Sequence, residues 1–248
     1  MGIMNRLAMA AMLAVATGEG VADDRSLAID AALALDRLDI ETFMMLYDET
    51  DRSQAALVRQ QLAAAGEPLQ KLLPGLRDTE SVMGNAEAWR VIQASIVGDR
   101  QTRGMIDTGY DARTLAEMRT AIPTLQRALR AQKGLDRPAS PEEAALLDAS
   151  NLFAVYIRLV ASPLGGISDN NDESVDQDLP TLVARFDRHL DALLARHAGD
   201  AEKRIVLQRI RTKWQFMRVT ILKYTQQATP AIVQRHGRDI VDGLRSLI

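Results

Sequence analysis

The sequence has no cysteine, few aromatic residues and few glycines or prolines. The absence of cysteine from all 248 residues excludes disulfides, thiolate zinc sites and cysteine nucleophiles. Aromatic residues make up 4% of the chain, with 15 glycines and 8 prolines, which is less than all-β sandwiches and barrels usually need. Alanine, leucine and arginine are abundant instead, and they favour helix. The composition therefore predicts a mostly α-helical protein.

Strong positive charge and long apolar runs are also missing. The chain is 47% hydrophobic and 25% charged, a balance typical of globular proteins. Its net charge is −3 and its pI about 5.7, so no nucleic-acid partner is expected. No run of eighteen apolar residues occurs, so we expect no integral membrane span in the mature chain.

The N-terminal segment 1–22 has the layout of a secretory signal peptide. Arg6 precedes an apolar run, Leu7–Ala16, and small residues at Gly20–Ala22 suit a cleavage site. Ten apolar residues are too few to anchor the chain in a bilayer. This segment predicts a periplasmic or secreted protein. The alternative is an alanine-rich first helix of a cytoplasmic protein.

Beyond this segment the apolar residues recur every three or four positions, which predicts helices nearly everywhere and no β-strand. Ser140-Pro141-Glu142-Glu143 has the pattern of a capping box, and Asp200 and Thr229 are typical N-caps. The histidines fit no metal motif. The expected helices span 25–49, 53–77, 85–108, 111–131, 141–161, 175–198, 200–227 and 230–247.

The two tryptophans indicate an internal repeat. The octet that begins at Trp89 aligns with the octet that begins at Trp214, 125 residues later, and further leucine patterns align in the same order. This predicts an all-α protein of antiparallel helical bundles, built from two duplicated four-helix units. The units would span 23–131 and 141–248, joined by a linker at 132–140. The alternative is two unrelated helical stretches that share a generic amphipathic pattern.

Four short segments in the second unit carry a further signal. They are Ala149–Tyr156, Lys213–Met217, Pro230–Arg235 and Ile240–Leu244. In this order they resemble the type IV pilus methyl-accepting chemotaxis transducer N-terminal (PilJ-like) domain, which some family members carry twice. The resemblance implies a non-enzymatic sensor-type module, linked to signalling or to type IV pilus and chemosensory systems. The Arg-Met-Leu-Ser-Gln-Arg motif of that family is absent from both units.

Four residues are candidates for ligand binding. Arg37 and Arg158 lie in the first helix of each unit, where a guanidinium suits an anionic ligand held between helices. Each could instead be a surface arginine that covers apolar neighbours. Trp89 and Trp214 are first of all expected to anchor the two cores, and ligand stacking is the alternative. We predict no catalytic, cofactor-binding or metal-binding residue.

Other polar residues favour structural interpretations. The histidines are expected to be solvated helix residues; they are His189, His197 and His236. The acidic stretch 169–178 is expected to be a solvated loop, with calcium binding left open. Asp36 and Asp148, equivalent in the repeat, either face a bundle interior or are exposed or paired with arginine.

Three functions remain open on the sequence alone. The leading hypothesis is an exported sensor-type module that binds a small ligand or a partner protein of the envelope or of signalling. The alternative is a structural or adaptor protein of the cell envelope. The third is a helical-bundle enzyme with a metal or cofactor, which would need inward-facing histidines and carboxylates.

Overall fold

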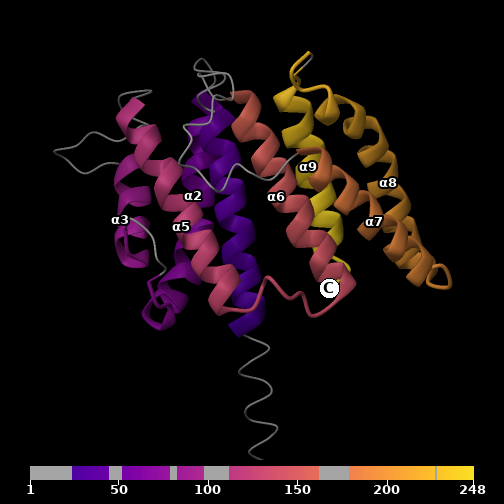
Figure 1. Ribbon diagram of the computed structural model, residues 1–248, viewed down its shortest axis with the longest axis horizontal. Helices are drawn as coiled ribbons and strands as arrows, with labels where there is room; N and C mark the ends of the chain where they lie inside the picture. The colour runs from indigo at the N-terminus through magenta and orange to yellow at the C-terminus, as the bar shows by residue number, and fades with distance from the viewer. Residues whose placement is uncertain (1–23, 45–51, 79–82, 98–111, 162–178, 227) are drawn as a thin grey trace, which may run out of the picture.

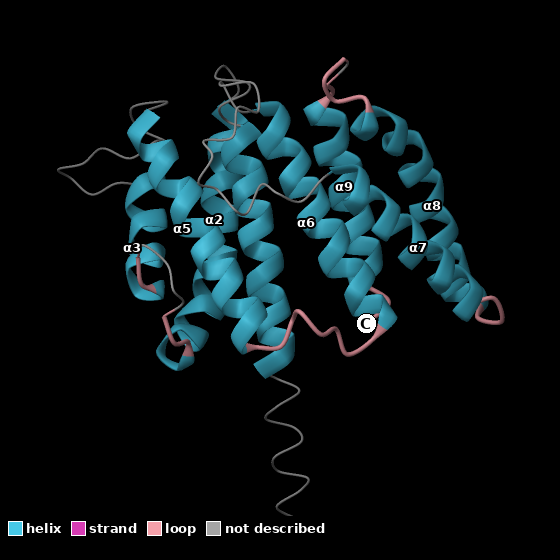
Figure 2. Ribbon diagram, viewed as in Figure 1, coloured by secondary structure: helices cyan, strands magenta, loops and turns pink. Residues whose placement is uncertain are grey.

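The structure, a computed structural model, describes residues 24–44, 52–78, 83–97, 112–161, 179–226 and 228–248. These residues form eight helices and no strand, so the all-α prediction is confirmed (Figures 1 and 2). A duplication of the two halves stays a prediction. After a first helix at 24–44, the helices are α2 (Arg52–Leu72), α3 (Asn85–Ile96), α5 (Ala112–Gln132), α6 (Pro141–Ala161), α7 (Leu179–Arg196), α8 (Ala201–Leu222) and α9 (Pro230–Arg245).

Helix boundaries follow the sequence signals closely, with two main corrections. The expected helix 53–77 ends at Leu72 as α2, and the 3₁₀ turn after it ends at Gly75. The expected helix 141–161 matches α6, but α8 ends at Leu222 and not at 227. Its C-cap residue, Lys223, leaves helical geometry at φ −104° and ψ 24°. Pro68 lies inside α2, whereas Pro74 falls in the short 3₁₀ turn that follows that helix. The expected ends at 45–49, 98–108 and 175–178 lie outside the described residues.

Two of the three predicted N-caps are confirmed. The Ser140 hydroxyl accepts a hydrogen bond from the Glu143 backbone N–H at 3.1 Å, and Asp200 accepts one from the Lys203 N–H at 3.0 Å. Each bond satisfies a donor that the first turn of a helix leaves free. Thr229 occupies the N-cap position of α9, but its side chain makes no capping bond there.

The second half is a closed ring of four helices. α6 contacts α7 and α9, and α8 contacts the same two helices, so each helix has two neighbours (Figure 1). Trp214, which is 2% exposed, fills the centre and meets the rings of Phe153 and Phe186 edge-on. Its indole N–H donates to Asp187 at 2.7 Å. Burial of this ring contributes on the order of 3 kcal/mol.

In the first half, the helices around Trp89 form part of one apolar core that continues into the second half. α3 packs against α5 and also contacts α2. Trp89 is 5% exposed and lies in the same apolar core as Ile92 of α3 and Leu69 of α2. Both tryptophans therefore lie in the core, as their interpretation as anchors requires.

The first helix, 24–44, lies between the two halves and is buried nearly all round from residue 28 onward (Figure 1). Several acidic side chains of this helix are buried at the junction between the halves. Asp39 meets Arg158 of α6 at 2.6 Å, and Glu41 pairs with Arg238 of α9. Asp39 and Glu41 are each 2% exposed, so burial is compensated by partners from the other half. This helix therefore joins the halves.

α6 is the most apolar helix in the described part of the chain. By length and hydropathy alone it is a possible membrane span, but 67% of that window is buried inside the protein, as in the core helix of a globular protein. This is weak evidence for a span, and the expectation of none stays a prediction.

Candidate functional site

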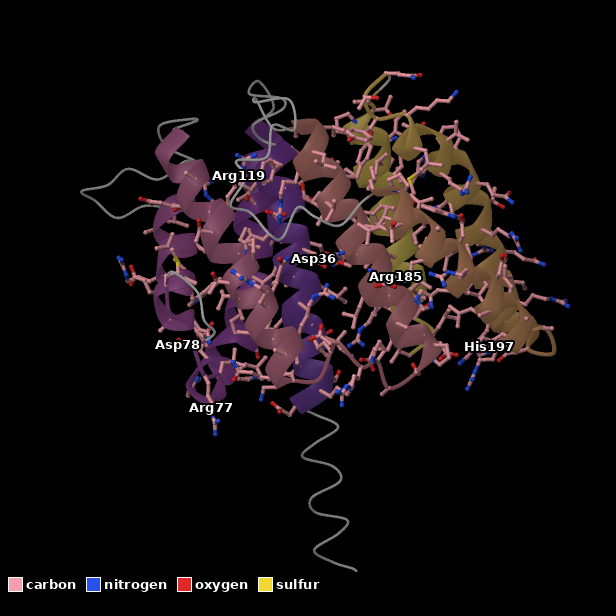
Figure 3. The ribbon with its side chains drawn as sticks, in the orientation of Figure 1. Asp36, Arg77, Asp78, Arg119, Arg185 and His197 are labelled. Carbon is pink, nitrogen blue, oxygen red and sulfur yellow. The ribbon has the colours of Figure 1, made fainter. Side chains whose placement is uncertain are left out.

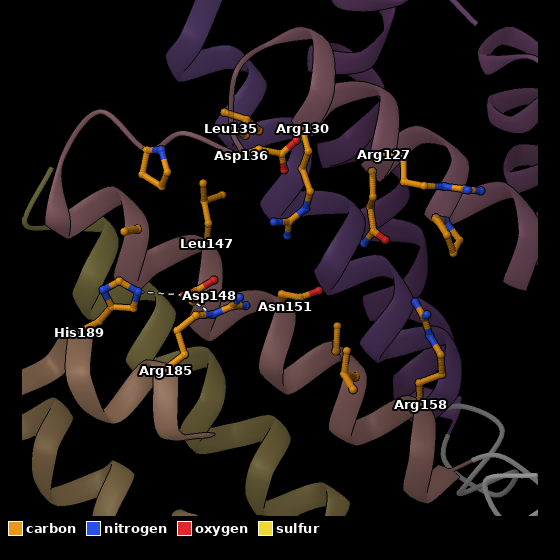
Figure 4. Close-up of a pocket in the computed structure, with 16 residues that line it drawn as sticks. Arg127, Arg130, Leu135, Asp136, Leu147, Asp148, Asn151, Arg158, Arg185 and His189 are labelled. Atoms are coloured by element: carbon orange, nitrogen blue, oxygen red, sulfur yellow. Dashed lines mark ion pairs between the residues drawn. The ribbon is translucent and has the colours of Figure 1, made fainter. Parts of the chain in front are cut away.

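A cleft of about 590 Å³ opens between the end of α5, the segment that follows it, α6 and α7 (Figure 4). Both halves contribute to its walls, because α5 belongs to the first and α6 and α7 belong to the second. The ionisable residues on these walls are four arginines, one histidine and two aspartates, so arginines outnumber the acids. They are Arg127, Arg130, Arg158, Arg185, His189, Asp136 and Asp148.

On the α6–α7 side, an arginine and a histidine share one carboxylate. Asp148 Oδ2 lies 2.8 Å from Arg185 Nε and 3.0 Å from His189 Nε2, and both ion pairs are drawn in Figure 4. The Asp148 side chain is 17% exposed, so water reaches it only partly. Arg185 and His189 are one turn apart on α7, which allows both to reach the same acid. These pairs fix the positions of the two α7 side chains at the rim.

On the α5 side, two arginines lack such partners. Arg127 is exposed and Arg130 is half-buried, and neither forms an ion pair with any residue that the structure describes. Their spacing of three places both on one face of the last turns of α5. Two guanidinium groups are therefore available to a ligand, each with planar donors that suit carboxylates and phosphates.

Asp36 lies behind this wall, on the first helix, near the middle of the molecule (Figure 3). It is 1% exposed, and Gln126, which lines the cleft, donates to its Oδ1 at 2.6 Å. Burial raises the pKa of Asp36 from 3.8 to about 6, against the opposing charge of Arg130. Asp36 is therefore a buried carboxyl group behind the arginine-rich α5 wall of the cleft.

Arg158 is the predicted ligand residue that the structure places in the cleft wall. Its Nε and Nη2 atoms donate to Asp39 Oδ2 at 3.2 and 2.6 Å. Its side chain is 11% exposed and that of Asp39 is 3% exposed, so this is a buried ion pair across the two halves. Arg158 therefore already forms a structural ion pair at the edge of the cleft.

The other three predicted residues lie elsewhere. Arg37 pairs with Asp242 of α9 and borders a separate cavity of about 20 Å³ between the first helix, α6 and α9. Trp89 and Trp214 lie in the apolar core, one in each half, and border neither cavity. The structure does not bring the four residues together at one site.

One of the three histidines corrects an expectation. His197 is 13% exposed, with its Nε2 atom 2.6 Å from Glu142 Oε1, and His189 meets Asp148 as described. Only His197 is largely withdrawn from water, beside an acid on α6, whereas the side chains of His189 and His236 remain 29% and 31% exposed. Among the described residues, no group of three or more His, Cys, Asp or Glu could hold a metal ion. The acidic stretch 169–178 lies outside the described residues.

Sequence reasoning missed most of the cleft. Arg127 with Arg130, and Arg185 with His189, are spaced by three and four residues, which places each pair on one helix face. That spacing was a usable local signal. It does not show that the two faces lie on opposite walls of one cleft, because this depends on how α5 and α7 are placed around α6.

Comparisons with known proteins add no identification. A scan of protein-family models, a search of curated proteins and a search of solved structures each found no match to this chain.

Proposed function

We propose that this protein is a non-enzymatic, sensor-type helical module that binds a small anionic ligand in the cleft between its two halves. The cationic lining of the cleft is the observation that carries the proposal. Four arginines meet there, and Arg127 and Arg130 form no ion pair among the described residues. A ligand with two or more carboxylate or phosphate groups would satisfy both, since each charge-assisted hydrogen bond contributes about 1.5–3 kcal/mol.

The location of the cleft supports a sensing role. Its α5 wall belongs to the first half, whereas α6 and α7 belong to the second. A ligand that bridges the two walls would favour one relative placement of the halves over others, which is how binding becomes a signal. The ion pairs between the first helix and α6 and α9 cross the same junction and would respond to such a shift.

The sequence supports placing this activity in the cell envelope. The signal-like segment 1–22 favours export, and the order of motifs after residue 141 resembles the PilJ-like domain. We therefore propose a periplasmic sensor module that reports to a signalling or pilus-associated system.

A thermal-shift and calorimetric series tests the cleft. Citrate and pyrophosphate serve as probes and glucose as a neutral control. We expect the anions to raise the melting temperature, and Arg127→Gln with Arg130→Gln to weaken binding by at least about a hundredfold, because two charge-assisted bonds are lost. Arg188→Gln is the matched control, since Arg188 is exposed on α7 and does not line the cleft. No response to either anion, or an equal response in the double variant, would refute the proposal.

A further inference from the structure

The outer edge of the second half concentrates positive charge. From Lys203 to Arg238 the chain contains nine lysines and arginines and no aspartate or glutamate, although the whole protein has a net charge of −3. This stretch covers nearly all of α8 and the first half of α9. Such asymmetry within an acidic chain indicates a polyanionic partner for this region.

Several of these cations are neutralised by neighbouring helices, and others are left over. Arg211 and Arg218 pair with Asp191 and Asp187 of α7 at 2.8 Å each, so these ion pairs link α8 to α7 within the bundle. A second set forms no ion pair with any residue in the described part of the chain and is exposed. It includes Arg209 on α8, Lys223 at the C-cap of α8 and Arg235 on α9.

Apolar side chains are exposed among these unpaired cations. On α8 the exposed fractions are 48% for Ile205, 61% for Phe216 and 53% for Val219, and on α9 the fraction is 40% for Ile232. The Phe216 ring also meets that of His236 on α9 edge-on, with centroids 5.7 Å apart. An exposed aromatic and three exposed aliphatic side chains on adjoining helices need an apolar cover.

The α8 residues share one helix face. Positions 205, 209, 216 and 219 recur at helical spacing, on the side opposite the buried stripe that contains Trp214, and Lys223 follows as the C-cap residue of α8. They extend over about 27 Å at 1.5 Å per residue. α8 lies at the outer edge of the helix array, at the right in Figure 1, so no described helix covers this side. We call these five residues, with Ile232 and Arg235, the α8–α9 face.

We propose that the α8–α9 face binds the surface of an anionic lipid bilayer, with α8 lying in the membrane plane. A bilayer provides partners for both kinds of side chain on this face. Its headgroups carry negative charge for the cations, and its acyl boundary accepts Phe216, Val219 and the isoleucines. Nucleic acid would meet the cations but leave the aliphatic side chains in water. A second copy, packed by two-fold symmetry, would place like charges of Arg209 and Lys223 close together.

Vesicle co-sedimentation with the full chain tests the proposal. We expect binding to vesicles of phosphatidylcholine with phosphatidylglycerol, and little binding to phosphatidylcholine alone. Arg209→Gln with Lys223→Gln should weaken binding roughly thirtyfold, since each cation near an anionic surface contributes about fivefold. Phe216→Ser with Val219→Ser should weaken it at least about tenfold by loss of apolar burial. The control is Val97→Ser, which changes an apolar residue, 47% exposed, at the end of α3.

Three results would overturn the proposal. The first is equal binding, or none, to the two kinds of vesicle. The second is full vesicle binding by the Phe216 and Val219 double variant together with binding of duplex DNA by the wild-type chain. Together these results would mean that the face attracts polyanions by charge alone. The third is a dimer of the wild-type chain, seen by light scattering, that the same variant dissociates. These readouts do not depend on the cleft, so they remain informative whatever the anion-binding series shows.

Discussion

Replacement of Asp36 by asparagine is expected to change how the stability of this protein depends on pH. Asp36 is 1% exposed, and its burial raises its pKa from 3.8 to about 6. The folded protein therefore holds this proton more tightly than the unfolded chain does. The stabilisation is fully present below pH 3.8 and is lost as the pH rises through about 6.

The size of the effect follows from the two pKa values. At 1.36 kcal/mol per pKa unit, ionisation of Asp36 costs the folded state about 3 kcal/mol at pH 7.5 and about half of that at pH 5. Asparagine cannot ionise, so the stability of Asp36→Asn relative to wild type should rise by about 1.4 kcal/mol from pH 5 to pH 7.5. Constant differences between the two side chains cancel in this comparison.

Urea unfolding of both proteins at the two pH values measures this quantity. Glu67→Gln is a suitable control, because Glu67 is exposed on α2, pairs with Lys71 and has a lowered pKa, so it stays ionised at both pH values. A difference between Asp36→Asn and wild type that is the same at pH 5 and pH 7.5 would refute the reasoning. If the variant does not fold, a carboxyl titration of wild-type Asp36 by NMR near its ordinary value would refute it equally.

Two further substitutions test the packing between helices. Gly237→Ala would place a Cβ atom 2.9 Å from the ring of Phe153, so we expect the free energy of unfolding in urea to fall by about 1–3 kcal/mol. The control is Gly199→Ala, which should change little because no atom lies within 4 Å of the added Cβ. Equal effects of the two substitutions would contradict the close packing of α9 on α6. Arg158→Met removes the guanidinium that pairs with the buried Asp39 carboxylate and should cost about 3–5 kcal/mol, most of which Arg158→Met with Asp39→Leu should restore. No recovery in the double variant would show that packing, and not charge, dominates there.

Local features were the most predictable part of the fold. The cap at Ser140 and the helix at 141–161 follow from hydrogen-bonding chemistry within a few residues, and α6 begins where that chemistry requires. The burial of Trp89 and Trp214 follows from their place in apolar stripes. These features depend on near neighbours in the chain, and the sequence displays those directly.

The junction between the halves was not predictable in the same way. Asp39 and Glu41 are acids that single-sequence reasoning places at a surface, yet both are buried because partners 119 and 197 residues away neutralise them. The cleft depends on the same long-range arrangement, since Arg130 and Arg185 line one cleft only when α5 and α7 are positioned around α6. Spacing along one helix contains no information about which other helix it will face.

The central position of the first helix also has a consequence for the order of folding. Its ion pairs with α6 and α9 join residues that are 118 to 215 positions apart, so the N-terminal helix leaves the ribosome long before its partners exist. The ring of α6 to α9 involves mostly shorter loops and can close sooner. We therefore expect residues 24–44 to dock last, after the ring of α6 to α9 has formed.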